Sequence, residues 1–235
     1  MTSSRIRQVY YSKAQVGYLE DMWEPYYNTA PVTPYFENDI FKRLYLEGDH
    51  KKSDYYGIVS YKFSSKHHRD CLHVDYGMKK DEYSHDVYAF EPNKQQFKNT
   101  TKANTFFDTY HPHLLEIGRE IVKRLFNKEI HTIKADRIYY NHWIAKSEVF
   151  DGYCREMLLP AMDLMENDPI ISDLCDMDAK YNNTVLSKHI QAFQIMSTER
   201  CMEVFGKPFY DHRTFVLERL PSIYFALKGH KVHHI

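Results

Sequence analysis

The order of segments along the chain constrains the fold most, because stretches typical of strands alternate with stretches that have helical spacing. Arg5 to Tyr11 (RIRQVYY) is rich in β-branched and aromatic residues and predicts a first strand. A helix is predicted from Thr33-Pro34, since Pro is favoured at the first helical position and apolar residues recur at helical spacing from there to Leu44. Tyr55 to Phe63 (YYGIVSYKF) predicts the next strand. The chain therefore opens with a β-α-β unit.

The alternation continues to the end of the chain. Further strands are predicted at Asp86–Phe90, Arg137–Ala145 and Lys231–Ile235. Further helices are predicted from Pro112, from Ser147 as N-cap with a kink at Pro160, over Thr184–Val204 and over Thr214–Leu227. The polar stretch Glu91–Asn104 is predicted to be a loop, and the polar stretch that ends at Asn183 a loop or a broken helix. This pattern predicts an α/β fold: a mixed, mainly parallel sheet with helices on both faces, in one domain of residues 1–235.

Composition and motifs exclude several protein classes. None of the eight glycines forms a G-x-G pair, which excludes the dinucleotide fingerprint, the Walker A loop and the G-x-S-x-G elbow. A formal net charge of -1 excludes a uniformly basic nucleic-acid-coating protein. The apolar runs are too short for a membrane segment. Four scattered cysteines and no hydrophobic signal core near Met1 predict a cytoplasmic protein with reduced thiols.

Strand ends supply the first candidates for a binding site, because open α/β sheets bind ligands beyond the carboxyl ends of their strands. This rule selects Tyr10, Tyr11, Ser60, Tyr61, Lys62, Asp86 and the segment Asn141 to Lys146. Asn141 and His142 stand out as polar residues within an otherwise apolar strand. Either they contact a ligand, or the amide and the imidazole satisfy local backbone groups.

Three stretches then resemble, in the same order, segments of one known family. A pattern of Asn141, Ile144, Lys146, Phe150, Asp151, Tyr153 and Cys154 looks like a segment of short bacterial glycosyltransferases from capsule and surface-polysaccharide gene clusters. Asp54–Phe63 (DYYGIVSYKF) is similar to one of their strands, and Phe215–Tyr224 (FVLERLPSIY) resembles their last helix. The likeness is to the GT-A-like nucleotide-diphospho-sugar transferases.

The resemblance implies a compact GT-A-like fold that moves a sugar from a nucleotide-sugar donor, such as a UDP-sugar, to a hydroxyl acceptor on a surface saccharide. The site positions that it marks are Tyr61, Lys62, Asn141, Lys146, Glu218 and Arg219. The family's H-Y-R-R reads Ser60-Tyr61-Lys62-Phe63 here, so a histidine and an arginine are replaced and Lys62 keeps a cation. Glu218-Arg219 can equally be an ion pair that fastens the last helix to the sheet.

Such a transfer passes through an oxocarbenium-like state while negative charge grows on the departing diphosphate. A divalent cation, Mn²⁺ or Mg²⁺, or a Lys or Arg would neutralise that charge. Asp86 is a candidate metal ligand, whereas Asp176-Met177-Asp178 is expected to be a solvated turn. The base that deprotonates the acceptor hydroxyl would be Glu37, Asp86 or Glu218.

Other functions stay open. The basic run Lys62–Arg69 together with Lys79-Lys80 would suit a phage-type glycosyltransferase, active in the host cytoplasm, on hydroxymethylated bases of modified DNA. The replaced family residues would also suit a non-catalytic nucleotide-sugar or protein-binding module. Histidine clusters such as His67-His68 and His233-His234 lack the spacing of zinc motifs and are expected to be surface imidazoles.

Overall fold

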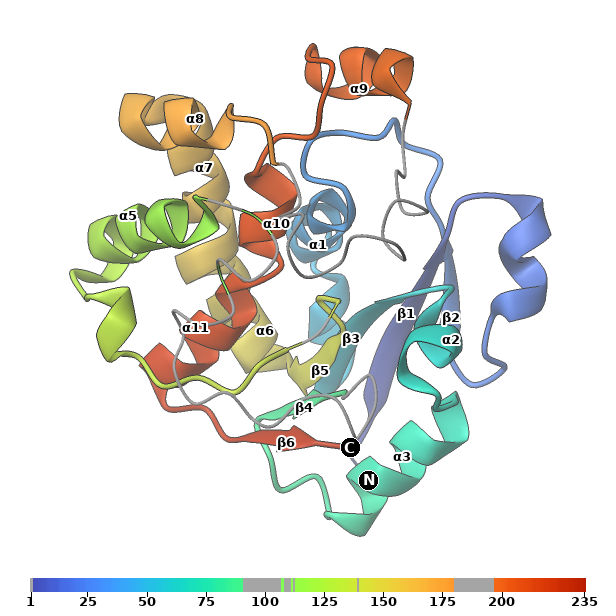
Figure 1. The fold of residues 1–235 in the computed structure, drawn as a ribbon. Coiled ribbons are helices and arrows are strands. Elements are labelled where there is room, and N and C mark those ends of the chain that lie inside the picture. Colours follow the sequence, from blue (N-terminus) through green and yellow to red (C-terminus); the bar gives the residue numbers. More distant parts are fainter. Residues whose placement is uncertain (1, 91–106, 108–110, 112, 139, 180–196) are drawn as a thin grey trace.

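The structure, a computed structural model, describes residues 2–90, 107, 111, 113–138, 140–179 and 197–235. These residues form a six-stranded sheet in the order β2-β1-β3-β5-β4-β6 (Figure 1). The strands are β1 (Ser4–Tyr10), β2 (Glu24–Tyr27), β3 (Tyr55–Ser60), β4 (Val87–Ala89), β5 (Trp143–Lys146) and β6 (Val232–His234). Strand β5 is antiparallel to both of its neighbours and the other pairs are parallel. The predicted α/β class with a mixed, mainly parallel sheet is confirmed.

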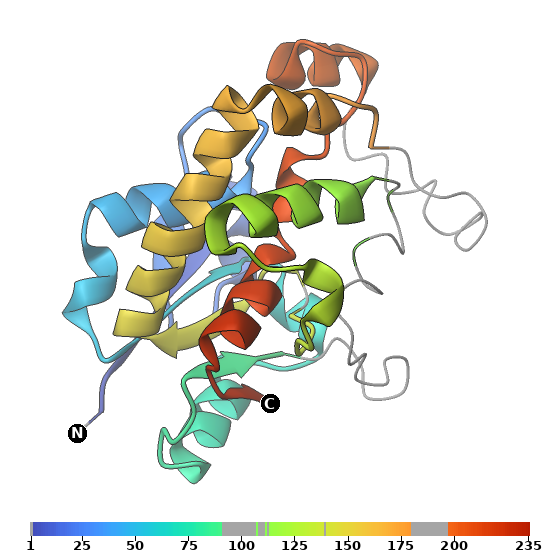
Figure 2. The ribbon, with the colours of Figure 1, turned by 90° about the vertical axis from the view of Figure 1, so that its left-hand side faces the viewer.

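Helices cover both faces of the sheet, but unequally (Figures 1 and 2). The larger layer contains α1 (Glu37–Leu46), α5 (Leu114–Phe126), α6 (Ser147–Tyr153), a π-helical turn (Cys154–Leu158), α7 (Leu159–Asn167), α10 (Arg213–Leu217) and α11 (Leu220–Lys228), with α8 (Pro169–Cys175) and α9 (Thr198–Phe205) beyond them. The opposite face carries α2 (Phe63–His67) and α3 (Cys71–Lys80). Short 3-10 helices connect other elements at Lys13–Tyr18, Asp49–Lys52 and Ile130–Thr132.

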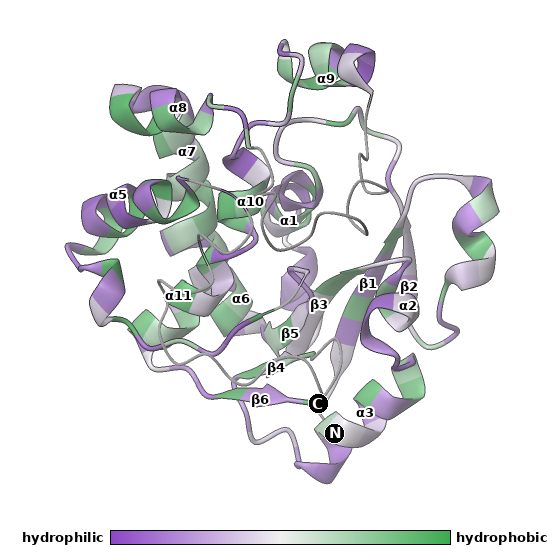
Figure 3. Cartoon of the chain, in the orientation of Figure 1, coloured by the Kyte–Doolittle hydropathy of each residue, from purple (hydrophilic) through white to green (hydrophobic). Residues whose placement is uncertain are grey.

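Two apolar cores result from the alternation of side chains along the strands. In β3, Tyr56 and Ile58 join the core under the larger helical layer, whereas Tyr55 and Val59 join the core beneath α2 and α3. Figure 3 shows the apolar colouring concentrated on the central strands and on the sides of the helices that cover them. Among the described residues, no helix is both long enough and apolar enough to span a membrane.

Several element boundaries differ from the predicted ones. The first helix begins at Glu37 rather than at Pro34, because Phe36 has a positive φ of 47° that interrupts helical backbone. The predicted strand Arg137–Ala145 shrinks to β5, since Tyr140 and Asn141 both adopt left-handed backbone, with φ of 57° and 55°. Strand β3 likewise ends at Ser60, before the turn that leads into α2.

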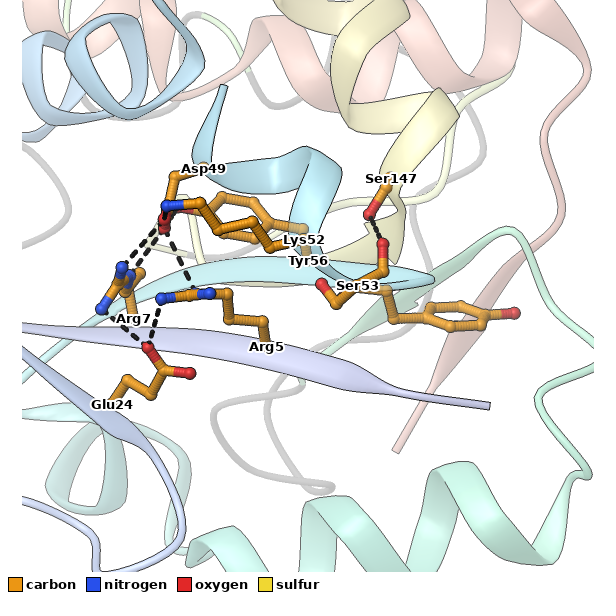
Figure 4. Close-up of polar contacts among 9 residues, drawn as sticks. Arg5, Arg7, Glu24, Asp49, Lys52, Ser53, Tyr56 and Ser147 are labelled. Carbon is orange, nitrogen blue, oxygen red and sulfur yellow. Dashed lines mark hydrogen bonds and ion pairs between the residues drawn. The ribbon is translucent and has the colours of Figure 1, made fainter. Parts of the chain in front are cut away.

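The predicted helices also change in detail. Ser147 is the first residue of α6 rather than its cap, and its hydroxyl donates to the Ser53 carbonyl oxygen at 2.5 Å (Figure 4). The kink expected at Pro160 takes the form of the π-helical turn, which accommodates a residue without an N–H. The helix predicted over Thr214–Leu227 is interrupted before Pro221 and becomes α10 and α11.

Three further outcomes concern the remaining segments. Strand β2 was not predicted, because it is short and contains Pro25, which an edge strand tolerates. Helix α8 occupies part of the polar stretch before residue 183. Helix α9 begins only at Thr198, after the extended N-cap Ser197, so the helix predicted over Thr184–Val204 does not run through residue 197, and residues 184–196 of that prediction lie outside the described residues. The loop predicted over Glu91–Asn104 lies outside the described residues. The strand predicted at the end of the chain is confirmed as β6.

A buried carboxylate fastens the segment after α1 to the sheet (Figure 4). Asp49 accepts hydrogen bonds from Arg7 at 2.7 and 2.9 Å, from the Tyr56 hydroxyl at 3.0 Å and from the Lys52 ammonium at 2.9 Å. Burial by itself would raise the pKa of Asp49, but these hydrogen bonds hold it well below the ordinary value. The cluster is therefore a structural anchor between β1, β3 and the chain that precedes β3.

Candidate functional site

One edge of the sheet, here called the carboxyl edge, collects the carboxyl ends of the parallel strands. Tyr10, Tyr27 and Ser60 end β1, β2 and β3 there. Strand β5 runs in the opposite direction, so its first residue lies at this edge, and Asn141 and His142, which directly precede β5, lie there too. Most of the residues selected from the sequence therefore lie at one edge.

Aromatic rings cover the carboxyl edge near β1 and β3. The Tyr10 and Tyr27 rings stack with centroids 4.9 Å apart. Tyr61 meets Tyr11 at 6.5 Å and Tyr18 at 6.2 Å, both edge to face. Tyr18 is 65% exposed and Tyr11 37%, so these rings present open faces to a ligand. The structure thus brings together the predicted residues Tyr10, Tyr11 and Tyr61, and adds Tyr18.

A cavity of about 590 Å³ adjoins Tyr61. It lies between the segment 17–22 and the residues of α2 and the start of α3, and Tyr61, Ser64 and Ser65 form part of its wall. Its lining includes the carboxylates of Glu20, Asp21 and Asp70, and among the described residues it contains no Lys or Arg. Its volume lies within the range of small-molecule sites, and its acidic wall favours neutral, hydroxyl-bearing ligands over phosphates.

Two of the predicted acids, Glu37 and Glu218, interact electrostatically although they belong to different helical segments. Glu37 is the first residue of α1, and Glu218 follows α10 directly. Burial raises the pKa of Glu218, and the negative charge of Glu37 raises it further, whereas Arg219 and Lys66 act in the opposite direction. The net effect is a raised pKa. Glu218 is therefore a more basic carboxylate than an exposed one would be.

Glu37 also interacts with one of the tyrosines. Burial raises the pKa of the Tyr11 hydroxyl, and the nearby negative charge of Glu37 adds to the rise. Arg43 lies close enough to lower it. Glu37 thus links the tyrosine cluster to Glu218, and these residues form one electrostatically coupled group.

Cations approach this group from α2 and from the end of α10. The Lys66 ammonium lies 4.8 Å from the centre of the Tyr140 ring and acts on the pKa values of both Glu218 and His142. The Lys62 ammonium lies 5.6 Å from the centre of the Tyr61 ring. Lys62 and Arg219 were predicted from the sequence, but Lys66 was not, although its spacing of four residues from Lys62 would place both on one side of a helix.

His142 and Asn141 are buried and bonded to the protein itself. The Ser60 backbone N–H donates to His142 Nε2 at 3.2 Å, so the neutral ring carries its proton on Nδ1 and donates it to His67 Nε2 at 2.9 Å. Burial, Lys66 and His67 hold the pKa of His142 well below its ordinary value. Asn141 donates to the Asn38 side-chain oxygen at 3.1 Å. These contacts fit the alternative in which both side chains satisfy neighbouring groups.

Some of the non-glycine residues with positive φ lie near the same edge. Phe36, Tyr140 and Asn141 all have positive φ although none is glycine. Such conformations cost free energy and are concentrated at functional sites. Phe36 directly precedes Glu37, and the Tyr140-Asn141 turn places the ring that contacts Lys66. Positive φ thus occurs directly before Glu37 and at the ring that contacts Lys66, and it also occurs away from this edge, for example at Glu82 and Asn127.

Asp86 and Lys146 lie elsewhere. Asp86 precedes β4 and Lys146 ends β5, so both are at the amino edge of the sheet, where the Lys146 ammonium meets Asp86 Oδ1 at 2.9 Å. Burial acts to raise the pKa of Asp86, but Lys146 and the Lys231 backbone N–H outweigh it, and the pKa is lowered. The structure does not bring these two residues to Glu37, Glu218 and the tyrosines. Asp176 also lies apart, in ion pairs with Lys207 and Arg213.

Comparison with known proteins gives one structural relative. No family model and no curated protein sequence matches the chain. A solved structure described as the apo form of WbbM, a bifunctional glycosyltransferase, has a similar fold, with a TM-score of 0.54 and 15% sequence identity. The similarity covers 99% of this chain and 44% of that one. The chain therefore has a glycosyltransferase-like fold, compatible with the GT-A-like architecture.

Proposed function

We propose that the protein is a glycosyltransferase that moves a sugar from a nucleotide-sugar donor to a hydroxyl group of a saccharide. The observation that carries this proposal is the coupled pair of Glu37 and Glu218, flanked by Lys66 and Arg219, at the carboxyl edge of a glycosyltransferase-like fold. Ligands of open α/β folds bind at this edge. The pair supplies a base and the cations supply charge compensation, the two requirements of the reaction.

Glu218 is assigned as the general base. Its raised pKa makes the ionised form a better proton acceptor, as general-base catalysis requires. The acceptor hydroxyl gives its proton to Glu218 while its oxygen bonds to the anomeric carbon of the donor sugar. The bond from that carbon to the diphosphate oxygen breaks, and its electron pair leaves with the nucleoside diphosphate. Glu37 acts as a positioning residue whose charge keeps Glu218 basic.

Lys62, Lys66 and Arg219 are assigned as the side chains that neutralise the negative charge growing on the diphosphate. Lys66 and Arg219 act on the pKa of Glu218, so they lie near the reacting groups. Mn²⁺ or Mg²⁺ would need several oxygen ligands at one point. Among the described residues, no three metal-donor atoms converge at the carboxyl edge, and Asp86 lies at the opposite edge. The proposed mechanism therefore relies on the cationic side chains.

The cavity beside Tyr61 is assigned to the saccharide acceptor. Its carboxylates can accept hydrogen bonds from sugar hydroxyls and would repel a diphosphate. Glu20 is held in place there by the Cys71 backbone N–H at 3.1 Å and by the Ser64 hydroxyl. The exposed Tyr18 ring provides an apolar face for a sugar ring. Donor and acceptor would thus occupy sites of opposite charge that meet at Tyr61.

A saccharide acceptor fits the charge distribution better than modified DNA. Lys62 and Lys66 belong to the carboxyl edge, but Lys79 and Lys80 lie at the far end of α3, and Lys79 pairs with Asp75 at 2.7 Å. Asp70, which lines the cavity, lies along the chain between Lys62 and Lys66 on one side and Lys79 and Lys80 on the other. A continuous basic surface for a phosphate backbone is therefore not formed by these lysines.

The experiment is a panel of UDP-, GDP- and CMP-sugars, each offered with saccharide acceptors and with hydroxymethylated DNA, with and without Mn²⁺. Release of the nucleotide together with a glycosylated saccharide is the expected result, and Glu218→Gln should abolish it. Activity that requires the DNA and falls steeply with salt would replace the saccharide by the nucleic acid. Binding of a donor without turnover would leave a non-catalytic module, and absence of any donor binding would refute the proposal.

A further inference from the structure

Three side chains with metal-binding atoms converge on the α3 face of the sheet, next to its last strand. Asp81 caps the end of α3, His85 precedes β4 and His233 lies in β6. One donor atom from each residue lies within 4.8 Å of those of the other two. The shared point is Asp81 Oδ2, which is 2.9 Å from His233 Nε2 and 3.8 Å from His85 Nε2.

The geometry of this cluster does not match a simple hydrogen-bonded pair. The two imidazole rings stack almost in parallel, with centroids 4.5 Å apart and planes at 11°, so both Nε2 atoms approach the same oxygen. Asp81 Oδ2 is shielded from solvent, yet neither ring aligns an N–H with it, and within the described part of the chain it has no hydrogen-bond partner. Two ring nitrogens therefore converge on one carboxylate oxygen without a hydrogen bond to it, an arrangement that a cation between them would stabilise.

The chemistry of the three donors selects the class of cation. Two imidazole nitrogens and one carboxylate oxygen form a set that suits Zn²⁺ and neighbouring transition metals, whereas Mg²⁺ and Ca²⁺ prefer oxygen ligands throughout. Ligand atoms around tetrahedral Zn²⁺ lie about 3 to 4 Å apart, given bond lengths of about 2.0 to 2.2 Å. The spacing in the cluster is of this size. Three protein ligands leave a fourth position for water.

We propose that Asp81, His85 and His233 form a binding site for a divalent transition metal of the Zn²⁺ class. The sequence hides this site, because the ligands from α3 and β4 are about 150 residues from the ligand in β6 and no short motif contains all three. The site is independent of the carboxyl edge and of the function proposed for it.

Metal binding would stabilise the edge of the sheet. Strand β6 pairs with β4 through three residues, and Figure 3 shows it as mostly hydrophilic beside the apolar β4. Short polar edge strands have little apolar contact to hold them in place. A metal that joins His233 to Asp81 and His85 would fasten β6 to the end of α3, and a ligand that binds the folded state raises its stability by mass action.

The test uses the full chain without a histidine tag, stripped with EDTA and dialysed. Zn²⁺ binding is measured by titration calorimetry, and Co²⁺ reports ligand geometry through its visible absorption. We expect one Zn²⁺ per chain. His85→Ala, His233→Ala and Asp81→Asn should each weaken Zn²⁺ binding by more than roughly 100-fold, which exceeds the loss seen when a residue that only contacts a metal ligand is replaced. Thermal unfolding in EDTA confirms that each variant folds.

Matched controls come from exposed histidines that also lie beside a carboxylate. His73 Nδ1 lies 2.7 Å from Asp70 Oδ1, and His131 Nδ1 lies 3.9 Å from Glu129 Oε2. His73→Ala and His131→Ala should keep the affinity and the Co²⁺ spectrum of the wild type. Stoichiometric binding that survives His85→Ala/His233→Ala, or no binding by the wild type at micromolar Zn²⁺, would overturn the assignment. Glycosyl transfer is not used as a readout, so this test is separate from the test of the proposed function.

Discussion

Replacing Glu218 by Gln should stabilise the protein and abolish its activity, and this pair of effects tests the assignment of the site. The pKa of Glu218 is raised in the folded state by burial and by Glu37, despite Arg219 and Lys66. The folded chain therefore binds a proton at Glu218 more readily than the unfolded chain does. The associated stability is fully present below the ordinary pKa of 4.5 and is lost as the pH rises through the raised pKa.

The size of the effect follows from this shift. Each unit by which a pKa is raised corresponds to about 1.4 kcal/mol between the two protonation states. Gln keeps the shape of the side chain without the charge, so Glu218→Gln should stabilise the fold at pH 7 by on the order of 1 kcal/mol, as substitutions at functional sites often do. Loss of a general base should lower kcat by roughly 10² to 10⁴-fold.

Urea unfolding at pH 4 and pH 8 measures the first effect, and nucleotide release from the donor measures the second. The matched control is Glu156→Gln, because the ammonium of Lys228 lowers the pKa of Glu156 and the sign is reversed. That variant should lose up to about 1 kcal/mol at pH 8 and keep full activity. If Glu218→Gln instead lowered stability at pH 8 and retained turnover, Glu218 would form a stabilising ion pair with Arg219, and the reasoning would be refuted.

Three further outcomes are expected. Asn141→Ala should lower the free energy of unfolding, measured in urea, by about 3 to 5 kcal/mol, because it removes the hydrogen bonds to Asn38 and to the Trp143 indole N–H and puts alanine at a positive φ. Asn141→Gly removes the strain of the positive φ and should lower it less, so equal losses in the two variants would contradict this reasoning. The lowered pKa of Asp49 makes the free energy of unfolding decrease below about pH 4, and Asp49→Asn should make this decrease smaller. An unchanged pH dependence in this range would contradict the role of Asp49 as an anchor. Tyr61→Ala should raise the KM for the acceptor about 3 to 10-fold, whereas Tyr61→Phe should leave it unchanged. An equal rise of the KM in the Tyr61→Phe variant would assign the effect to the hydroxyl instead of the ring.

The fold class could be predicted from the sequence because the periodicity of its strands and helices is strong. Strand β1, helix α5 and strand β6 lie close to their predicted positions. Two of the misplaced boundaries share a physical cause, since they occur where non-glycine residues adopt positive φ. Phe36 delays the start of α1, and Tyr140 and Asn141 shorten β5. Propensity cannot reveal such positions, because the surrounding structure imposes them.

The candidate site was predicted in part for a related reason. Glu37 and Glu218 were named as bases without any sequence signal that they would interact, because they are about 180 residues apart along the chain. Lys66 was missed because it belongs to a basic run, where a single lysine has no distinguishing feature. The raised pKa of Glu218 follows from burial and from neighbours distant in sequence. Chemistry of this kind is set by tertiary structure and not by a motif.

The direction of one strand decides which predicted residues can act together. In an all-parallel sheet, the residues after each strand would share the carboxyl edge, and Lys146 would join Tyr61 and Lys62 there. Because β5 is antiparallel, its end lies at the amino edge, where Lys146 pairs with Asp86. The same inversion carries His142 to the carboxyl edge, where it accepts from the Ser60 backbone N–H. The segment from Asn141 to Lys146 therefore begins at one edge of the sheet and ends at the other, so its residues cannot all act at one site.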